Sequence, residues 1–208
     1  MKTLVFHNTV GTAGEIIARG GLVGVPTETV YGLAADGLNA DAVEKIYEVK
    51  NRPETKPINL LVTGMAQVEA FCRNIPAAAY ALAAVFWPGP LTMILERRGS
   101  VPDIVTAGGD TVGVRCPDHP LTLELIEKAG RPLATPSANL SGMASPKNAA
   151  EVLAYFDGKI DAVIDGGPCA LGVASTIVAL TGDAPRILRL GDLRAADIFE
   201  KTGIQVIE

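Results

Sequence analysis

The chain has 208 residues, of which 48% are hydrophobic and 20% are charged, and its net charge is −5. This length and composition favour a folded domain with a substantial core and exclude a largely disordered chain. The acidic balance argues against a large nucleic-acid footprint, because neutralisation of phosphates supplies most non-specific affinity, although a local basic patch could still contact RNA.

Targeting and cysteine signals point to the cytoplasm. No apolar run approaches the roughly 18–20 uncharged residues that span a membrane. The first residues lack a long apolar region followed by a small-residue cleavage site, so no signal peptide is expected. The three cysteines, Cys72, Cys116 and Cys169, are widely spaced and odd in number, which fits neither a disulfide framework nor a zinc site. We therefore expect a cytoplasmic protein without membrane contact.

The first half of the chain predicts short helices and strands that alternate. Helices are expected over residues 11–19, 41–50, 66–72 and 76–86, and strands over residues 22–26, 32–36 and 58–62. Thr12 with Glu15 three positions later is a capping-box pattern for the first helix. Asn39 or Asp41 is the expected cap of the second.

The second half continues the alternation irregularly. Strands are expected over residues 91–95, 111–115, 133–135, 162–164, 176–180 and 187–190, and helices over residues 121–129, 148–155 and 192–201. A turn is expected over residues 96–99. The order favours an α/β (α+β) fold with a twisted, mixed sheet flanked by helices. No composition break marks a linker, so a single domain over residues 1–208 is expected.

Three cations lie within seven residues after the second predicted helix. They are Lys50, Arg52 and Lys56, and Pro53 and Pro57 stiffen the loop that carries two of them. Arg offers a planar fork and Lys a compact point charge, so such a loop suits a phosphate or a carboxylate. The alternative is a solvated helix end, where cations are common because of the helix dipole. Taken alone, the run favours that alternative.

Two polar loops and one arginine follow predicted strands, where open α/β sheets carry ligand sites. Residues 26–33 hold two threonines and a glutamate within four positions. Ser137 and Asn139 alternate, so both side chains point the same way if the segment is extended. Arg115 ends an apolar strand and could bind a carboxylate. Each feature alone equally describes an ordinary turn or a surface residue.

Several familiar nucleotide and catalytic motifs are missing. There is no Gly-x-x-x-x-Gly-Lys-Ser/Thr loop and no Gly-x-Ser-x-Gly elbow. His7 and His119 are too far apart in sequence to suggest a metal pair. Phosphate chemistry in this chain would therefore use side-chain cations and hydroxyls.

Taken together and in this order, the motifs resemble the YrdC-like family. The resemblance covers about residues 11–191 and is specific only in combination. The motifs that carry it are Pro26-Thr27-Glu28-Thr29-Val30-Tyr31-Gly32-Leu33, Lys50-x-Arg52-Pro53, Trp87-Pro88-Gly89-Pro90-Leu91-Thr92, Gly113-Val114-Arg115 and Ser137-Ala138-Asn139-Leu140-Ser141-Gly142.

The resemblance implies an ATP-dependent nucleotidyltransferase of tRNA modification, since typical members are L-threonylcarbamoyladenylate synthases. L-threonine and bicarbonate or CO2 give a carbamate, which attacks the α-phosphorus of ATP and releases pyrophosphate. The product passes to threonylcarbamoyl-transfer proteins that modify an adenosine of certain tRNAs, and a weak interaction with tRNA itself is also implied. The family fold is a twisted mixed sheet around a large, positively charged cavity.

The resemblance also carries site residues onto this sequence. Lys50 and Arg52, the Lys-x-Arg signature, are the expected catalytic residues. The expected ATP-binding residues are Lys50, Arg52, Lys56, Thr111, Ser137, Asn139, Ser145 and Arg189. The expected threonine-binding residues are Thr29, Arg115, Thr135 and Ser175. Arg115 would pair with the threonine carboxylate, and the three hydroxyls would bind its other polar groups.

No general base is obvious, and a carbamate needs none because it is already anionic. Catalysis is expected to rest on positioning and charge stabilisation. Mg2+ is expected to arrive with the ATP phosphates, and neither a protein metal site nor a tightly bound organic cofactor is expected.

Two departures from the family pattern concern length and one residue. Longer members carry a second domain and a linker that contributes to the ATP site, whereas this chain resembles the short, single-domain type. Leu61 stands where long members commonly carry a His near the amino acid.

Two alternatives remain open. One is a double-stranded RNA-binding paralogue without synthase activity; the Lys-x-Arg and Ser-x-Asn pairs of this chain favour the synthase. The other is a domain of a carbamoyltransferase, which is usually embedded in a larger chain.

Overall fold

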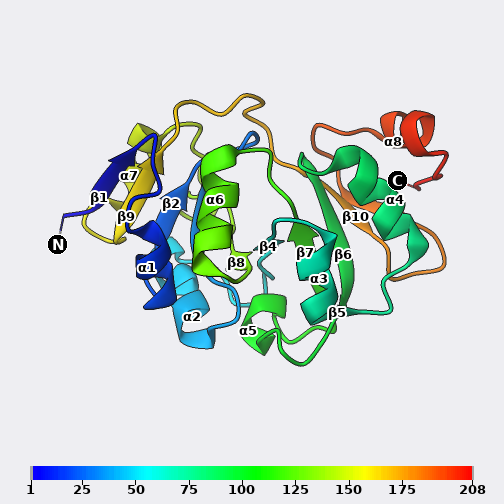
Figure 1. The fold of residues 1–208 in the computed structure, drawn as a ribbon, viewed down its shortest axis with the longest axis horizontal. Coiled ribbons are helices and arrows are strands. Elements are labelled where there is room, and N and C mark those ends of the chain that lie inside the picture. The colour runs from blue at the N-terminus through cyan, green and yellow to red at the C-terminus, as the bar shows by residue number, and fades with distance from the viewer. Residues whose placement is uncertain (1, 208) are drawn as a thin grey trace.

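A mixed sheet runs through the length of the molecule, and helices cover both of its faces (Figure 1). The computed structural model describes residues 2–207. Within them the sheet has eleven strands in the order β1-β9-β2-β3-β8-β4-β7-β6-β10-β11, with β5 paired to β6. The strands are β1 (Leu4–His7), β2 (Val23–Val25), β3 (Gly32–Asp36), β4 (Leu60–Leu61), β5 (Cys72–Arg73), β6 (Leu91–Arg97), β7 (Thr111–Arg115), β8 (Leu133–Ala134), β9 (Ala162–Asp165), β10 (Thr176–Ala179) and β11 (Arg186–Arg189).

Parallel and antiparallel pairs both occur, as the sequence predicted. β1 and β2 run parallel to β9, β4 to β7 and β10 to β6. The remaining strand pairs are antiparallel. The order interleaves strands from both ends of the chain, because β9 lies between β1 and β2. The predicted mixed sheet flanked by helices is confirmed.

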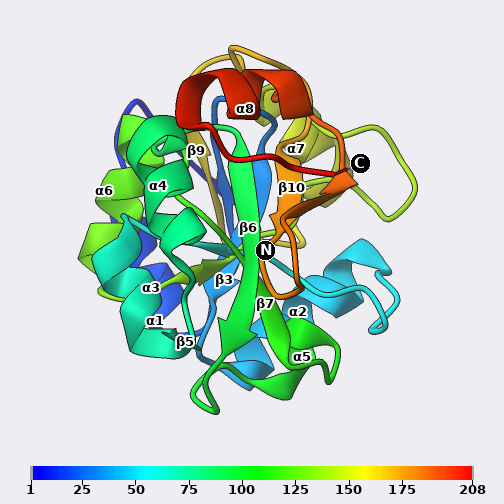
Figure 2. The ribbon, with the colours of Figure 1, turned by 90° about the vertical axis from the view of Figure 1, so that its right-hand side faces the viewer.

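The helices lie on both sides of this sheet. They are α1 (Ala13–Ala18), α2 (Ala40–Lys50), α3 (Met65–Phe71), α4 (Ala77–Phe86), α5 (Asp103–Thr106), α6 (Pro120–Ala129), α7 (Ala149–Phe156) and α8 (Ala195–Thr202). In Figure 2, α1, α3, α4 and α6 lie on one side of the central strands, with α2 and α5 on the other. Contacts between α1 and α6 and between α2 and α5 agree with this arrangement.

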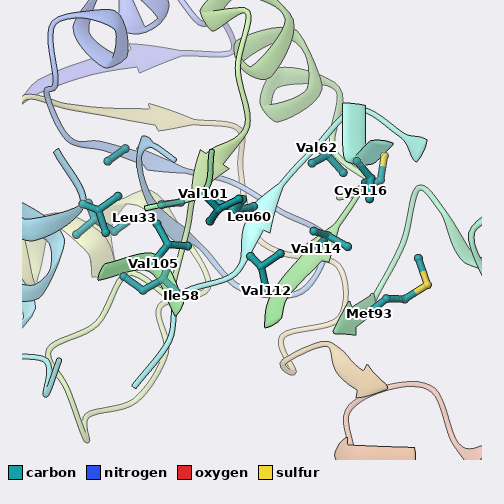
Figure 3. Packing of buried hydrophobic residues seen from close by; sticks show 14 of the residues in the cluster. Leu33, Ile58, Leu60, Val62, Met93, Val101, Val105, Val112, Val114 and Cys116 are labelled. Atoms are coloured by element: carbon teal, nitrogen blue, oxygen red, sulfur yellow. The ribbon is translucent and has the colours of Figure 1, made fainter. Parts of the chain in front are cut away.

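Two apolar clusters hold the layers together. The larger one contains Leu33, Leu60, Met93 and Val114, which are completely buried; they lie on β3, β4, β6 and β7, and Figure 3 shows them among the packed residues. The smaller one packs α1 and α6 onto β2, β3 and β9. Burial of a large apolar side chain stabilises the fold by roughly 1.5–3 kcal/mol, so these clusters fix the strand ends around which the loops are built.

Of the two helix caps predicted from the sequence, one is confirmed and the other is wrong. The Asn39 side chain accepts hydrogen bonds from the backbone N–H groups of Asp41 and Ala42, which confirms it as the cap of α2. Thr12 is the N-cap residue of α1 but makes no side-chain cap hydrogen bond, so the predicted capping box is wrong. Its backbone, at φ −93° and ψ 13°, is not in the extended conformation from which a cap hydroxyl reaches the first turn.

Most element bounds agree with prediction to within a few residues, and β3 and β7 agree in full. Three short elements were not predicted: β1, β5 and α5. The expected turn over residues 96–99 begins late, because β6 continues through Arg97 to pair with β5 and β7. No helix within the described residues is both long and apolar enough to cross a membrane.

Candidate functional site

A cavity of about 360 Å³ opens where the ends of the central strands meet the polar loops. Eight of its lining residues are polar but uncharged: Thr27, Thr29, Tyr31, Asn59, Thr135, Ser137, Ser145 and Ser175. Its charged lining residues are all arginines: Arg52, Arg115 and Arg189. A wall of hydroxyls and guanidinium groups suits an anionic, hydrogen-bonding ligand.

Arg52 reaches the cavity from the loop after α2. Its Nε donates to the carbonyl of Lys56 at 3.1 Å and its Nη2 to the carbonyl of Pro57 at 2.9 Å, so the loop folds around the guanidinium. Burial lowers the pKa of Arg52, and nearby Tyr47 opposes this shift. Within residues 2–207 no carboxylate lies close enough to Arg52 for an ion pair, so its charge is available to a ligand.

Arg115, at the end of β7, is held more tightly. Its Nη2 lies 2.6 Å from Oε2 of Glu28, its Nη1 donates to Thr29 Oγ1 at 2.8 Å, and its Nε donates to the carbonyl of Gly89 at 3.1 Å. Burial lowers the pKa of Arg115, while Glu28 raises it. The expected role of Arg115 toward a carboxylate must therefore be exercised from within an existing ion pair.

Arg189, at the end of β11, lines the cavity next to Ser175. It donates to the carbonyl of Ser175 from Nε at 3.1 Å and from Nη2 at 2.9 Å, and Nη2 also reaches Ser175 Oγ at 3.1 Å. Ser175 Oγ in turn shares a 2.8 Å hydrogen bond with the buried Thr92. Burial lowers the pKa of Arg189, with a smaller contribution from the charge of Arg115.

Lys50, an expected catalytic residue, lies behind the cavity wall instead of in it. The residue is 1% exposed and is absent from the cavity lining. Its Nζ donates to the carbonyl of Ser137 at 2.5 Å and also to the carbonyl of Asn139. Burial, together with the charge of Arg52, lowers the pKa of Lys50 to about 7. Lys50 therefore supports the Ser-x-Asn loop from beneath.

The Ser-x-Asn loop is a closed hydrogen-bond unit. Ser137 Oγ donates to Asn139 Oδ1 at 2.5 Å, and Asn139 Nδ2 donates to the carbonyls of Leu140 and Met143. Ser137 lines the cavity, whereas Asn139 does not, because its amide is turned into the loop. The sequence predicted that the Ser137 and Asn139 side chains would point in the same direction. They instead hydrogen-bond to each other, and only Ser137 faces the cavity.

Of the remaining expected residues, some line the cavity and others lie outside its wall. Thr135 and Ser145 line the cavity, and Thr29, although completely buried, contributes to its wall. Lys56 is exposed and Thr111 lies at the far end of β7 from Arg115, and neither belongs to the lining. The structure thus gathers eight of the twelve expected residues around one cavity and places Lys50, Lys56, Thr111 and Asn139 outside its wall.

Other lining residues were given no role from the sequence. Asn59 lies in the loop before β4, and Tyr31 Oη is fixed by donating to the carbonyl of Gly167 at 2.8 Å. Burial raises the pKa of Tyr31 to about 12, so its hydroxyl stays protonated. Near Arg189 the wall becomes apolar through Ile94, Ile177 and Leu188. The sequence assigned no role to these positions, because Ile94, Ile177 and Leu188 become neighbours only when β6, β10 and β11 pair.

The donor set does not form a protein metal centre. Residues 2–207 contain no group of three or more His, Cys, Asp or Glu side chains that could hold a metal ion. The lining also contains no carboxylate, which is the ligand that Mg2+ prefers in proteins.

Known proteins resemble this chain over most of its length. The family model Sua5_yciO_yrdC, described as "Telomere recombination", matches residues 15–191. The threonylcarbamoyl-AMP synthase of Pyrococcus abyssi is 46% identical over 191 residues, which are 92% of this chain and 56% of that protein. The Bacillus subtilis threonylcarbamoyl-AMP synthase is 43% identical over 91% of this chain and 55% of its own length.

A solved structure agrees with these sequence matches. The crystal structure of P. abyssi Sua5 complexed with L-threonine has a TM-score of 0.95 and 41% identity, and the match covers 100% of this chain and 63% of that chain. This chain therefore spans about half the length of the curated relatives it matches, and somewhat more of the crystallised chain.

Proposed function

Because this chain belongs to the Sua5/YciO/YrdC family, we propose that it forms threonylcarbamoyl-AMP and pyrophosphate from L-threonine, bicarbonate or CO2, and ATP. Two relatives are named for this product, and the solved neighbour was crystallised with L-threonine. The relatives are longer than this chain, so the activity, the substrates and the partners are all parts of the proposal.

One observation carries the proposal: the cavity wall combines two arginines that lack a carboxylate partner with a third that has one. Arg52 and Arg189 make no ion pair in residues 2–207, whereas Arg115 pairs with Glu28. Such a wall suits a ligand pair in which one member is strongly anionic and the other carries balanced charges. ATP and a zwitterionic amino acid are such a pair.

The nucleotide is assigned to Arg52, Ser137 and Arg189, of which Arg189 adjoins the threonine residues through its hydrogen bond to Ser175. The guanidinium groups would neutralise the triphosphate of MgATP, and the serine hydroxyl would bind a phosphate oxygen. The apolar stretch of Ile94, Ile177 and Leu188 would cover the uncharged part of the nucleotide. Mg2+ enters this assignment as part of the substrate.

Threonine is assigned to the side that holds Thr29, Thr135, Ser175 and Arg115. Arg115 uses its Nε and one hydrogen of Nη1 internally, which leaves a second Nη1 hydrogen for a carboxylate. The hydroxyls of the other three residues supply donors and acceptors for the remaining polar groups. Leu61 lines the cavity without a polar group to offer.

The adenylation step would then proceed without a protein base. A carbamate oxygen bonds to the α-phosphorus, the bond from that phosphorus to the bridging oxygen breaks, and the electron pair leaves with pyrophosphate. The lining contains neither a carboxylate nor a histidine. The protein's contribution is to align the two anions, which repel each other, and to neutralise charge on the phosphates. The product would pass to proteins that transfer the threonylcarbamoyl group to tRNA.

The test is the release of pyrophosphate from ATP in the presence of Mg2+, bicarbonate and L-threonine. We expect release that depends on threonine, and the adenylate should be detected by mass spectrometry. Release that is unchanged when threonine is omitted would contradict the proposal. Salt-sensitive binding of double-stranded RNA without any such release would instead support the RNA-binding alternative, which the acidic chain does not favour.

Replacing Arg52 by Ala should lower threonine-dependent turnover about 100-fold or more, since it removes a positioned cation from the phosphates. The loss of two hydrogen bonds to backbone carbonyls should cost only about 1–3 kcal/mol of stability. The matched control is Arg73→Ala, an exposed arginine paired with Glu96 outside the cavity lining, which should keep full activity. Equal activity in the two variants would remove Arg52 from the site.

A further inference from the structure

Glu28 is a buried carboxylate to which the proposed reaction assigns no role. It lies between Thr27 and Thr29, which both line the cavity, but Glu28 itself does not. The chain bends at Glu28, and its carboxylate is turned toward Arg115 and the backbone of Asp118, behind the wall. Its Oε2 lies 2.6 Å from Arg115 Nη2 and accepts a hydrogen bond from the backbone N–H of Asp118 at 3.1 Å.

This pair holds the Arg115 guanidinium in place from the rear. Glu28 contacts it from behind, Thr29 Oγ1 from the cavity side and the carbonyl of Gly89 at Nε. Both partners of the ion pair are more than nine-tenths buried, with 9% of the Glu28 side chain and 8% of the Arg115 side chain exposed. The guanidinium plane is therefore fixed before any ligand arrives.

Stability alone does not explain the pair. Desolvating two charges is expensive, and apolar residues of similar volume often replace a buried ion pair without loss. Within residues 2–207, Glu28 Oε1 also lacks a hydrogen-bond partner, while Oε2 alone contacts Arg115 Nη2 and the N–H of Asp118. A costly, incompletely satisfied pair beside a cavity calls for a functional explanation.

We propose that Glu28 is a positioning residue that makes the Arg115 side of the cavity accept a zwitterion and reject a small phosphate-like anion. The inference rests on the proposed function, because it assigns the amino acid to this side. The negative charge of Glu28 cancels that of Arg115, so only Arg52 and Arg189 attract a polyanion. The held guanidinium still offers directed N–H groups to a carboxylate whose charge is balanced within its own molecule.

Two substitutions separate the negative charge of Glu28 from its positioning of the Arg115 guanidinium. Glu28→Gln keeps the shape and the acceptor for Asp118 but removes the charge. The variant should bind inorganic phosphate at least about tenfold more tightly than the wild type, because Arg115 is no longer neutralised. Glu28→Asp keeps the charge but withdraws it by one methylene. It should leave phosphate binding within about twofold and weaken L-threonine binding about tenfold, with MgATP binding unchanged.

The binding experiment is calorimetry with inorganic phosphate on the wild type, Glu28→Gln and the double variant Glu28→Gln/Arg115→Met. The gain in phosphate affinity should vanish in the double variant, since it needs the charge of Arg115. Asp36→Asn is the matched control: Asp36 is also buried and pairs with Arg131 at 2.6 Å, outside the cavity lining. It should show no gain.

A folded Glu28→Gln with the phosphate affinity of the wild type would overturn the inference, as would an equal gain in Asp36→Asn. If Glu28→Gln does not fold, Glu28→Asp is the variant that tests the inference. An L-threonine affinity of Glu28→Asp equal to that of the wild type, measured by calorimetry, would overturn the inference. These readouts need no turnover. Absence of threonine-dependent pyrophosphate release from the wild type would therefore refute the proposed synthase while leaving the phosphate result to judge the charge balance.

Discussion

At the residue scale, the cationic loop shows how differently three neighbouring cations can be used. Lys50 is fully buried under the Ser-x-Asn loop, Arg52 faces the cavity and Lys56 is exposed. The sequence predicts three charges in one loop, but it cannot predict which side each points to. That choice depends on the carbonyls of Ser137 and Asn139, which lie nearly ninety positions later in the chain.

Lys50 should give folding stability an unusual pH dependence. Its pKa is about 7 in the folded protein and about 10.4 when unfolded, so the unfolded chain binds more protons between these values. The contribution of Lys50 to stability should therefore rise by up to about 1.4 kcal/mol per pH unit from pH 7 toward 10 and be lost as the pH falls through 7.

Urea denaturation at pH 6.5, 7.5 and 8.5 measures this effect by comparing the wild type with Lys50→Met. The difference in unfolding free energy between the two should change with pH in the direction stated, because all other groups titrate in both proteins. Parallel pH profiles would show that the Lys50 amine is protonated throughout.

At the element scale, the helices and longer strands are predictable because their apolar spacing is local. The elements that escaped prediction are a four-residue strand at the start, a two-residue strand and a one-turn helix. β1 has mixed burial and exists because it pairs with β9. Such short pieces are fixed by their partners in the sheet, and a single sequence does not display those partners.

The same reasoning explains which site residues could be predicted. Motif order grouped the hydroxyl loops and the arginines of the cavity, but the Glu28–Arg115 pair joins residues 87 positions apart. Nothing in either motif specifies that these two charges neutralise each other. Likewise, Thr12 has the right residue type for a cap, and only its backbone angles exclude that role.

The segment that follows β11 leaves no room for a side chain at Gly191, where it packs against the residues before β10. A Cβ there would lie 2.2 Å from the carbonyl oxygen of Ala174 and 2.4 Å from the carbonyl carbon of Ser175. Gly191→Ala should therefore shift the segment that carries Ser175, lower turnover and cost about 1–3 kcal/mol of stability.

Chemical denaturation and the pyrophosphate assay test this prediction together. Gly182→Ala is the control, because the nearest atom to a methyl group placed there would be 4.0 Å away. It should change stability by less than about 0.5 kcal/mol. A Gly191→Ala protein as stable and as active as Gly182→Ala would show that this contact yields easily.

At the scale of the whole molecule, charge is distributed unevenly. The chain carries −5 overall, yet the charged residues of the cavity lining are arginines. The cavity lining is therefore cationic within an acidic chain, although Arg115 is paired with Glu28. This contrast fits the proposed binding of one polyanionic small molecule better than binding along a nucleic-acid backbone.

Salt should consequently affect the two proposed substrates differently. Raising NaCl from about 0.1 M to about 1 M shortens the Debye length from about 10 Å to about 3 Å. The Kd for MgATP, measured by calorimetry, should rise about tenfold or more, whereas the Kd for the zwitterion L-threonine should change less than about twofold. Equal weakening of both ligands would argue against a division of the cavity into a cationic and a neutral side.

The interleaved strand order also affects the rate and the order in which the protein folds. β1 pairs with β9, so that His7 meets Asp165, a residue 158 positions later, and the cavity wall draws on residues from Thr27 to Arg189. Loops of this length must close before their contacts can stabilise them, which slows folding. During synthesis the cavity is therefore among the last features to be completed, because a nascent chain that ends before β11 lacks Leu188 and Arg189 of its lining.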